Sequence, residues 1–152
     1  MDVVYSPYLI LLSIGVAILA SYVALNLAYS ITHAKGKAHA AWLIGGSLAM
    51  GVGIWSMHFI GMLAFEMPDM EMAYDIPLMV LSVIVAVIGS MLALYVVSRP
   101  IVDPKSVGWG GIAMAAAISG MHYIGMYSMR MSARIEWNWF LVAASVLVAL
   151  IA

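Results

Sequence analysis

Two short runs of the chain combine methionine, histidine and an aromatic residue in the same order. The runs are Met57-His58-Phe59-Ile60-Gly61-Met62 and Met121-His122-Tyr123-Ile124-Gly125-Met126. In each run the histidine and the second methionine are four positions apart, which places both side chains on one face of a helix. Thioether sulfur is a soft ligand that suits Cu(I), and imidazole nitrogen suits copper as well. The spacing therefore predicts a copper site with the ligands His58, Met62, His122, Met126, Met57 and Met121.

The two runs belong to a longer internal repeat with an offset of 64 residues. Residues 49–67 match residues 113–131 at nine of nineteen positions. Two crossings of the chain separate the copies, so both copies run in the same direction and both histidines are expected at one side of a membrane. Glu66 and Arg130 are equivalent in the repeat and carry opposite charges, which predicts an ion pair at the surface.

The methionines are unevenly distributed along the chain. There are 14, and nine of them lie at or just beyond the ends of the two motif segments: Met57, Met62, Met67, Met70, Met72, Met121, Met126, Met129 and Met131. Methionine fills gaps in many protein cores, and for any single methionine this packing role is the more common one. A gap filler has no reason to gather at one membrane face, so the cluster as a whole favours metal ligation.

The side chains of the motifs have alternative interpretations. Ionisable groups inside membrane spans usually mark function, which favours a ligand role over a structural role for His58 and His122. Tyr123 replaces Phe59 in the second copy, and it either donates a hydrogen bond to a bound cofactor or anchors the helix at the membrane interface. His33 and His39 lie in a basic connection, where we expect solvated surface residues.

The composition of the chain predicts the elements that carry these motifs. Of 152 residues, 66% are apolar, and the 6 basic and 7 acidic residues fall in clusters. The uncharged stretches between clusters are mostly longer than the roughly 20 residues that a transmembrane helix needs. We predict an all-α transmembrane bundle of about five helices, four of them complete spans, at 8–31, 40–64, 76–98, 107–129 and from 138 onward.

The same composition sets the domain organisation and excludes some classes of function. We interpret residues 1–152 as a single transmembrane domain that ends inside its fifth helix, without an output domain. The chain has no cysteine and a net charge of −1, which excludes thiolate chemistry and gives no basic patch for nucleic acid. Small residues recur along the two motif helices and predict close helix packing: Gly46, Gly53, Gly61, Gly110, Ala117 and Gly125.

The loops between the predicted helices predict the orientation. The first connection carries Lys35 and Lys37, and the third carries Arg99 and Lys105, whereas the second carries four acidic residues and no base. Basic loops favour the cytoplasmic side. We therefore expect the amino terminus and both motifs at the outer face of the membrane.

The two motif runs, together with the apolar sequence around them, resemble the MHYT domain. That resemblance implies an integral sensor module of the bacterial cytoplasmic membrane, in which the repeated Met, His and Tyr residues hold copper and sense a diatomic gas such as O2, CO or NO. It also implies a sensor rather than an enzyme, linked to a cytoplasmic output domain such as a diguanylate cyclase or phosphodiesterase. The chain departs from the family pattern in having Ile60 and Ile124 at the threonine position, and in ending before a third motif.

Two other functions stay open from the sequence. His58 and His122 are also suited to be the axial ligands of a haem b group in a membrane electron-transfer or sensor protein, although the excess of methionine does not favour this. Copper transport ranks third, since the inner halves of the motif helices lack polar groups. The bilayer is the expected partner, and a homodimer is compatible with the sequence.

Overall fold

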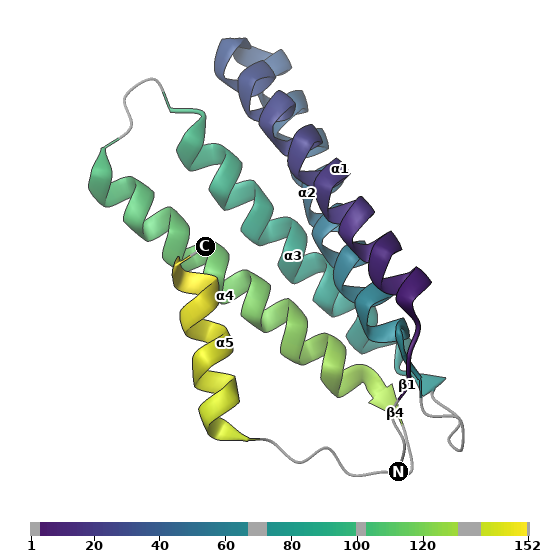
Figure 1. Cartoon of the computed structure of the whole chain (residues 1–152). Coiled ribbons are helices and arrows are strands. Elements are labelled where there is room, and N and C mark those ends of the chain that lie inside the picture. Colours follow the sequence, from purple (N-terminus) through teal and green to yellow (C-terminus); the bar gives the residue numbers. More distant parts are fainter. Residues whose placement is uncertain (1–3, 67–72, 100–102, 131–137, 152) are drawn as a thin grey trace.

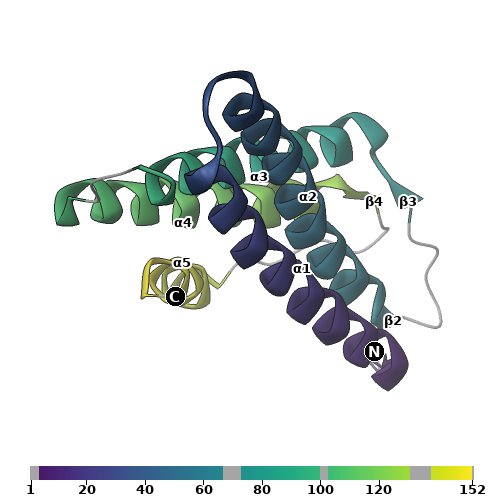
Figure 2. The ribbon, with the colours of Figure 1, turned by 90° about the horizontal axis from the view of Figure 1, so that it is seen from above.

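The computed structural model describes residues 4–66, 73–99, 103–130 and 138–151, without the side chains of Val4 and Glu66. Within them lie five helices, α1 (Pro7–His33), α2 (Gly36–Leu63), α3 (Ile76–Val97), α4 (Pro104–Ser128) and α5 (Trp139–Ile151). Each helix packs mainly against its neighbour in the chain, in alternating directions (Figures 1 and 2). The predicted all-α bundle is confirmed, with helix ends a few residues from those expected.

The first four helices form two hairpins. Only Ala34 and Lys35 separate α1 from α2, and Gly36 makes this tight reversal with a φ of 57° that favours glycine. Pro7 and Pro104 occupy the first turns of α1 and α4, where the missing N–H costs nothing. Asp75 precedes α3 and its side chain accepts a hydrogen bond from the backbone N–H of Leu78 at 3.2 Å.

Short strands close both hairpins at the end of the bundle that carries the motifs. Strand β1 (Val4–Tyr5) pairs antiparallel with β2 (Phe65–Glu66), and β3 (Ala73–Tyr74) pairs with β4 (Met129–Arg130). The amino terminus therefore lies at the motif end, and the motif ends of α2 and α4 lie at the same end of the bundle (Figure 1). This confirms that both motif copies arrive at one side.

The repeat extends beyond the segment that sequence comparison at one offset detects. Residues of α1 match residues of α3 at an offset of 69 rather than 64, because α3 and α4, with 22 and 25 residues, are shorter than α1 and α2, with 27 and 28. The identical pairs are Leu9/Leu78, Leu12/Leu81, Ser13/Ser82, Val16/Val85, Ala17/Ala86, Ser21/Ser90, Ala24/Ala93 and Leu25/Leu94. Tyr5 and Tyr74 are also equivalent, and each lies in a strand that closes its hairpin. The repeating unit is therefore a whole helical hairpin.

The packing is that of a membrane protein. Large apolar side chains face outward, including Tyr8 at 83% and Leu25 at 74% exposed. The residues buried between helices are mostly small, as in transmembrane bundles where close approach replaces hydrophobic burial: Gly46, Ser47, Gly51, Ser82, Ala86, Gly89, Ser90, Gly110, Ala115 and Gly125.

Three of the described helices are long and apolar enough to cross a bilayer on length and composition, namely α1, α2 and α3. With 27, 28 and 22 residues, they are about 40, 42 and 33 Å long at about 1.5 Å per residue. The sequence analysis expected a fourth complete span. Helix α4 has 25 residues but is less apolar, because glycine, serine, histidine and tyrosine recur in it, and it does not meet the same criterion.

Small residues pack closely between the helices, as predicted. At one equivalent crossing in each hairpin a glycine lies against an alanine. A Cβ on Gly53 would lie 2.8 Å from the Cβ of Ala20, and a Cβ on Gly89 would meet the Cβ of Ala117 more closely still. Ala20 is equivalent to Gly89, and Gly53 to Ala117. Each hairpin thus holds one methyl group at this crossing, carried by opposite helices.

Candidate metal site

The two motif histidines meet at the motif end of the bundle. His58 comes from α2 and His122 from α4, and their Nδ1 atoms are 3.5 Å apart, at the long limit of a hydrogen bond. The rings lie edge to face, with centroids 4.6 Å apart. Since a neutral imidazole carries one N–H, one Nδ1 can donate to the other, and the two rings form a single polar unit between the helices.

The far side of His58 has a buried nitrogen with an unused lone pair. Its Nε2 is inaccessible to solvent and has no hydrogen-bond partner among the described residues. If the Nδ1–H of His58 donates a hydrogen bond to His122, Nε2 is the unprotonated nitrogen of a neutral imidazole. An unprotonated nitrogen is the form that binds a metal ion. Buried polar atoms are rarely left without a partner. This nitrogen is therefore a candidate ligand atom; the hydroxyl oxygens of Tyr74 and Ser90 are the other buried side-chain atoms without a partner among the described residues.

Gly125 and Met62 border this nitrogen. A Cβ added to Gly125 would lie 3.4 Å from His58 Nε2 and 3.7 Å from Met62 Cε. The Met62 side chain is only 9% exposed. The glycine of the second motif thus leaves space beside a histidine and a methionine of the first. The sequence analysis assigned Gly125 to packing alone, because a sequence does not show that one motif's glycine faces the other motif's imidazole.

The structure brings some predicted ligands together and leaves others undecided. His58, Met62 and His122 are neighbours, whereas Met57, Met121 and Met126 lie on the same helical turns and stay predicted ligands. Met121 is 2% exposed, and the other two are half-buried. Four methionines of the predicted cluster fall outside the described residues: Met67, Met70, Met72 and Met131.

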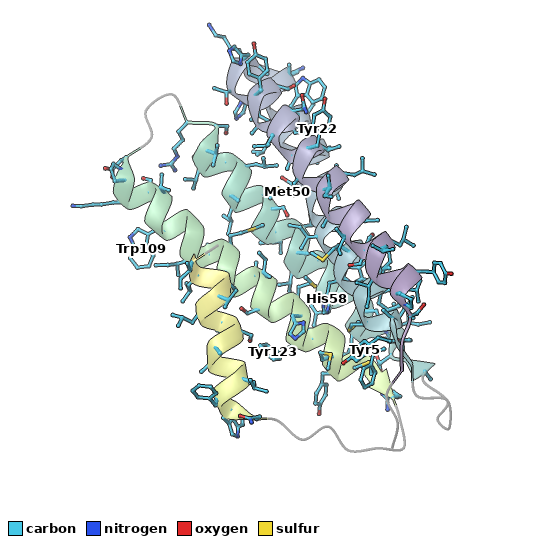
Figure 3. All side chains as sticks on the ribbon, in the orientation of Figure 1. Tyr5, Tyr22, Met50, His58, Trp109 and Tyr123 are labelled. Atoms are coloured by element: carbon cyan, nitrogen blue, oxygen red, sulfur yellow. The ribbon has the colours of Figure 1, made fainter. Side chains whose placement is uncertain are left out.

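Tyr123 lies beside the pair and reaches toward α5. Its ring packs edge-on against His122, with centroids 4.9 Å apart, and its hydroxyl lies 2.6 Å from the hydroxyl of Ser145. Figure 3 shows Tyr123 pointing into the space between α4 and α5. The structure therefore places one end of this side chain at the histidines and the other at a different helix, and its predicted role in cofactor binding stays a prediction.

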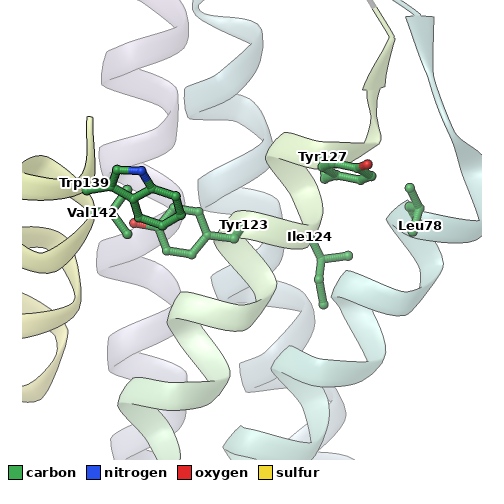
Figure 4. A pocket seen from close by; sticks show the side chains of 6 residues that line it. All are labelled: Leu78, Tyr123, Ile124, Tyr127, Trp139 and Val142. Carbon is green, nitrogen blue, oxygen red and sulfur yellow. The ribbon is translucent and has the colours of Figure 1, made fainter. Parts of the chain in front are cut away.

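An apolar cavity of about 460 Å³ opens next to Tyr123. Figure 4 shows the residues that line it, from α3, α4 and α5: Leu78, Tyr123, Ile124, Tyr127, Trp139 and Val142. The lining is almost entirely carbon, so the cavity suits apolar groups and not ions. It separates the motif turn of α4 from the start of α5.

A cluster of three aromatic rings, from α2 and β3, lies around the first motif. Trp55 stacks on Phe59 with centroids 4.9 Å apart, and Phe59 meets the Tyr74 ring edge-on at 5.2 Å. The indole N–H of Trp55 donates to the Ser82 hydroxyl at 2.9 Å, which ties α2 to α3. Burial raises the pKa of the Tyr74 hydroxyl above its usual value, so this group stays protonated at neutral pH.

Arg130 forms an ion pair with Asp75 at the same end, and the predicted pairing with Glu66 stays a prediction. Its guanidinium donates to the carboxylate of Asp75, whereas the side chain of Glu66 lies outside the described residues. The hydrogen bond from Arg130, together with the one from the Leu78 N–H, holds the pKa of Asp75 below its usual value. The ion pair and the pairing of β3 with β4 connect the start of α3 to the end of α4, next to the second motif.

The donors at this site are imidazole nitrogen and thioether sulfur. Among the described residues no three His, Cys, Asp or Glu side chains lie close enough together to hold a metal ion by themselves, so a metal site here would need methionine sulfur as well. Nitrogen and thioether donors of this kind suit copper better than Mg²⁺ or Ca²⁺, which prefer oxygen ligands.

Comparison with known proteins gives a match to one family along most of the chain. The model of the MHYT family, described as a bacterial signalling protein N-terminal repeat, matches residues 1–44, 51–108 and 116–152. No solved structure gives a significant match to the chain.

Curated relatives are signalling proteins that are several times longer. The chain is 43% identical over 148 residues to the bifunctional diguanylate cyclase/cyclic di-GMP phosphodiesterase MucR of Pseudomonas aeruginosa, covering 97% of the chain and 22% of that protein. It is 41% identical over 150 residues to the signaling protein YkoW of Bacillus subtilis, covering 99% and 18%. It is 36% identical over 146 residues to the cyclic di-GMP phosphodiesterase NbdA of P. aeruginosa, covering 96% and 18%. The chain thus spans about a fifth of the length of these relatives.

Proposed function

Because this chain belongs to the MHYT family of bacterial signalling proteins, we propose that it is a sensory input domain of the cytoplasmic membrane that binds copper at the His58–His122 pair. The observation that carries the proposal is the buried Nε2 of His58, which lacks a hydrogen-bond partner among the described residues and borders Met62 and the open space at Gly125. A soft ion at this nitrogen would satisfy a buried polar atom that the described residues leave unpaired.

The residues of the chain divide the work of such a site. His58 offers the lone pair of Nε2, and His122 fixes the orientation of that ring by accepting a hydrogen bond from the Nδ1–H of His58, in the way that outer partners orient metal-bound histidines. Met62 offers a thioether next to the same space, and Met57, Met121 and Met126 are further sulfur donors on the same turns. Gly125 keeps the space open.

The bound ion would supply an open coordination position for a diatomic gas such as O2, CO or NO, and copper itself is the other candidate signal. For a signal to pass on, α2 and α4 must have two alternative packings, and the ligand must bind to one of them more tightly. A ligand shifts such an equilibrium only by its difference in affinity for the two states. Tyr123 and α5 lie next to the pair and are placed to respond.

Two relatives, MucR and NbdA, suggest the kind of output domain. These relatives are cyclic di-GMP enzymes, which supports a cytoplasmic cyclic di-GMP enzyme as the partner domain of this input module. Catalysis would then reside in that domain and not in the helical bundle. The positive loops favour a topology with the amino terminus and the copper site at the outer face.

The geometry supports an ion better than a haem. In a bis-histidine haem the two imidazoles lie on opposite faces of the macrocycle. The rings of His58 and His122, with centroids 4.6 Å apart, are in direct contact and leave no room for a macrocycle between them. We therefore expect the Soret band of added haemin to stay where free haemin in the same detergent has it, without the shift that ligation by two histidines causes.

The test is a titration of the purified, detergent-solubilised chain with Cu(I) against a chromogenic chelator. We expect tight binding that is lost in His58→Ala and weakened in His122→Ala. The matched control is the double variant His33→Ala, His39→Ala, which removes the two remaining histidines of the chain and should bind copper as the parent does. Equal copper binding by the His58→Ala variant and the parent would end the proposal.

A further inference from the structure

Three serines occupy the same place in successive repeats. Ser13 of α1 and Ser82 of α3 are equivalent at the offset of 69 residues. Helix α5 matches α3 at an offset of 63, with the identical pairs Leu78/Leu141, Ser82/Ser145, Val83/Val146, Val85/Val148, Ala86/Ala149 and Ile88/Ile151. Asn138 precedes α5 and accepts hydrogen bonds from the N–H groups of residues 140 and 141, as Asp75 does from Leu78 before α3. Each of α1, α3 and α5 thus carries its serine about two turns from its start.

Each of these serines forms a hydrogen bond to a motif helix within three residues of a motif histidine. Ser13 donates to the backbone carbonyl of Met57 at 2.8 Å. Ser82 accepts from the indole of Trp55 at 2.9 Å, and Ser145 shares a 2.6 Å hydrogen bond with Tyr123. The partners differ in chemistry, but all three bonds cross from one helix to the next.

These serines do not need a partner on another helix to satisfy their hydroxyl groups. A hydroxyl facing hydrocarbon needs a partner, and a serine can find one on its own helix. Ser21 does this, since it donates to the Ala17 carbonyl. Ser82 also donates to its own helix, to Met79, yet it accepts from Trp55 as well.

The contacts surround the motif turn of α2 and extend to that of α4. Ser13 of α1 and Ser82 of α3 both bond to α2 close to His58, at Met57 and Trp55. A Cβ on Gly61 would lie 3.6 Å from the Ser13 hydroxyl, so the motif glycine leaves ample room for that serine. Ser145 holds the Tyr123 ring, whose other edge meets His122. Small rotations of either helix would change the contact between the two imidazoles.

We propose that Ser13, Ser82 and Ser145 are positioning residues that set the mutual orientation of the His58 and His122 rings. The effect of these serines on copper binding rests on the proposed function, because a copper site at this pair depends on the orientation of the two rings. The geometric part stands on the hydrogen bonds themselves and is testable without metal.

The experiment records the imidazole nitrogen signals of the metal-free chain, labelled with 15N-histidine and held in detergent micelles. In Ser13→Ala, Ser82→Ala and Ser145→Ala we expect shifted signals for His58 and His122 and unchanged signals for His33 and His39. The control Ser21→Ala should leave all four histidines unchanged. The conservative variants Ser13→Thr, Ser82→Thr and Ser145→Thr keep the hydroxyl and should restore the parent signals.

Two results would overturn the assignment. One is an unchanged spectrum for His58 and His122 in all three alanine variants. The other is a disturbance of all four histidines in alanine and threonine variants alike, which would show that the serines support the fold in general. A copper titration of the same variants separates this proposal from the proposed function. We expect about threefold weaker binding for each lost interhelical bond, whereas a parent chain that binds no copper refutes only the metal site.

Discussion

Replacing Gly125 by alanine should separate the fold of the bundle from its metal chemistry. The new methyl carbon would lie 3.4 Å from His58 Nε2 and 3.7 Å from Met62 Cε, which are ordinary contact distances, so the helices need not move. Alanine is also the better helix former, by about 0.5–1 kcal/mol. We therefore expect the thermal unfolding midpoint in detergent to stay constant or to rise slightly.

Copper binding should respond in the opposite direction. A metal ion bonded to Nε2 on the side that faces Gly125 would lie within contact distance of that carbon, which is itself only 3.4 Å from Nε2. Removal of outer partners of a metal site costs roughly 10- to 100-fold in affinity, and a direct obstruction belongs at the upper end. We expect the affinity for Cu(I) to fall about 100-fold, equivalent to about 2.7 kcal/mol.

The repeat supplies the matched control. Gly61 is equivalent to Gly125, and a Cβ there would lie 3.6 Å from the Ser13 hydroxyl and away from the space beside His58. Gly61→Ala should gain the same helix propensity and bind copper as the parent does. The assay is the chelator competition, run beside thermal unfolding for both variants. If Gly125→Ala bound copper with parental affinity, the assignment of Nε2 as the ligand atom would be refuted.

Three further outcomes follow from the fold. Gly53→Ala should lower the unfolding midpoint by overpacking, at a cost of about 1–3 kcal/mol, and adding Ala20→Gly should recover most of the loss, because the other hairpin carries the same pair reversed. The lowered pKa of Asp75 means that its ion pair stabilises the chain above the ordinary value of about 3.9 and that this stability is lost as the pH falls through the lowered value; acid melts of Asp75→Asn should lack this component. In intact cells a Tyr5→Cys variant should react with an impermeant thiol reagent and Lys37→Cys should react only after permeabilisation, and the reverse pattern would invert the proposed topology.

The sequence was sufficient for the features that follow from period and composition. Long uncharged stretches predicted the helices, and the repeated motif predicted that His58 and His122 meet at one end of the bundle. Both follow from local rules: a helix needs about 20 apolar residues to cross a bilayer, and two crossings restore the chain direction.

Features that depend on contacts between helices were not predictable in the same way. Strands β3 and β4 pair Arg130 with Ala73, and the Arg130 side chain forms its ion pair with Asp75, two residues beyond Ala73; the sequence repeat pointed only to Glu66, whose side chain lies outside the described residues. The role of Gly125 depends on which imidazole faces it. The equivalence of Ser13 with Ser82 was hidden because the helices of the second hairpin are shorter than those of the first, so that α1 and α3 match at an offset of 69 residues and α2 and α4 at 64.

The most direct test of the account is X-ray absorption spectroscopy at the copper edge of the Cu(I)-loaded, full-length chain. The account predicts imidazole scattering together with a sulfur shell, and the loss of both in His58→Ala. A spectrum with oxygen neighbours alone, or one that is the same in the parent and in His58→Ala, would contradict it.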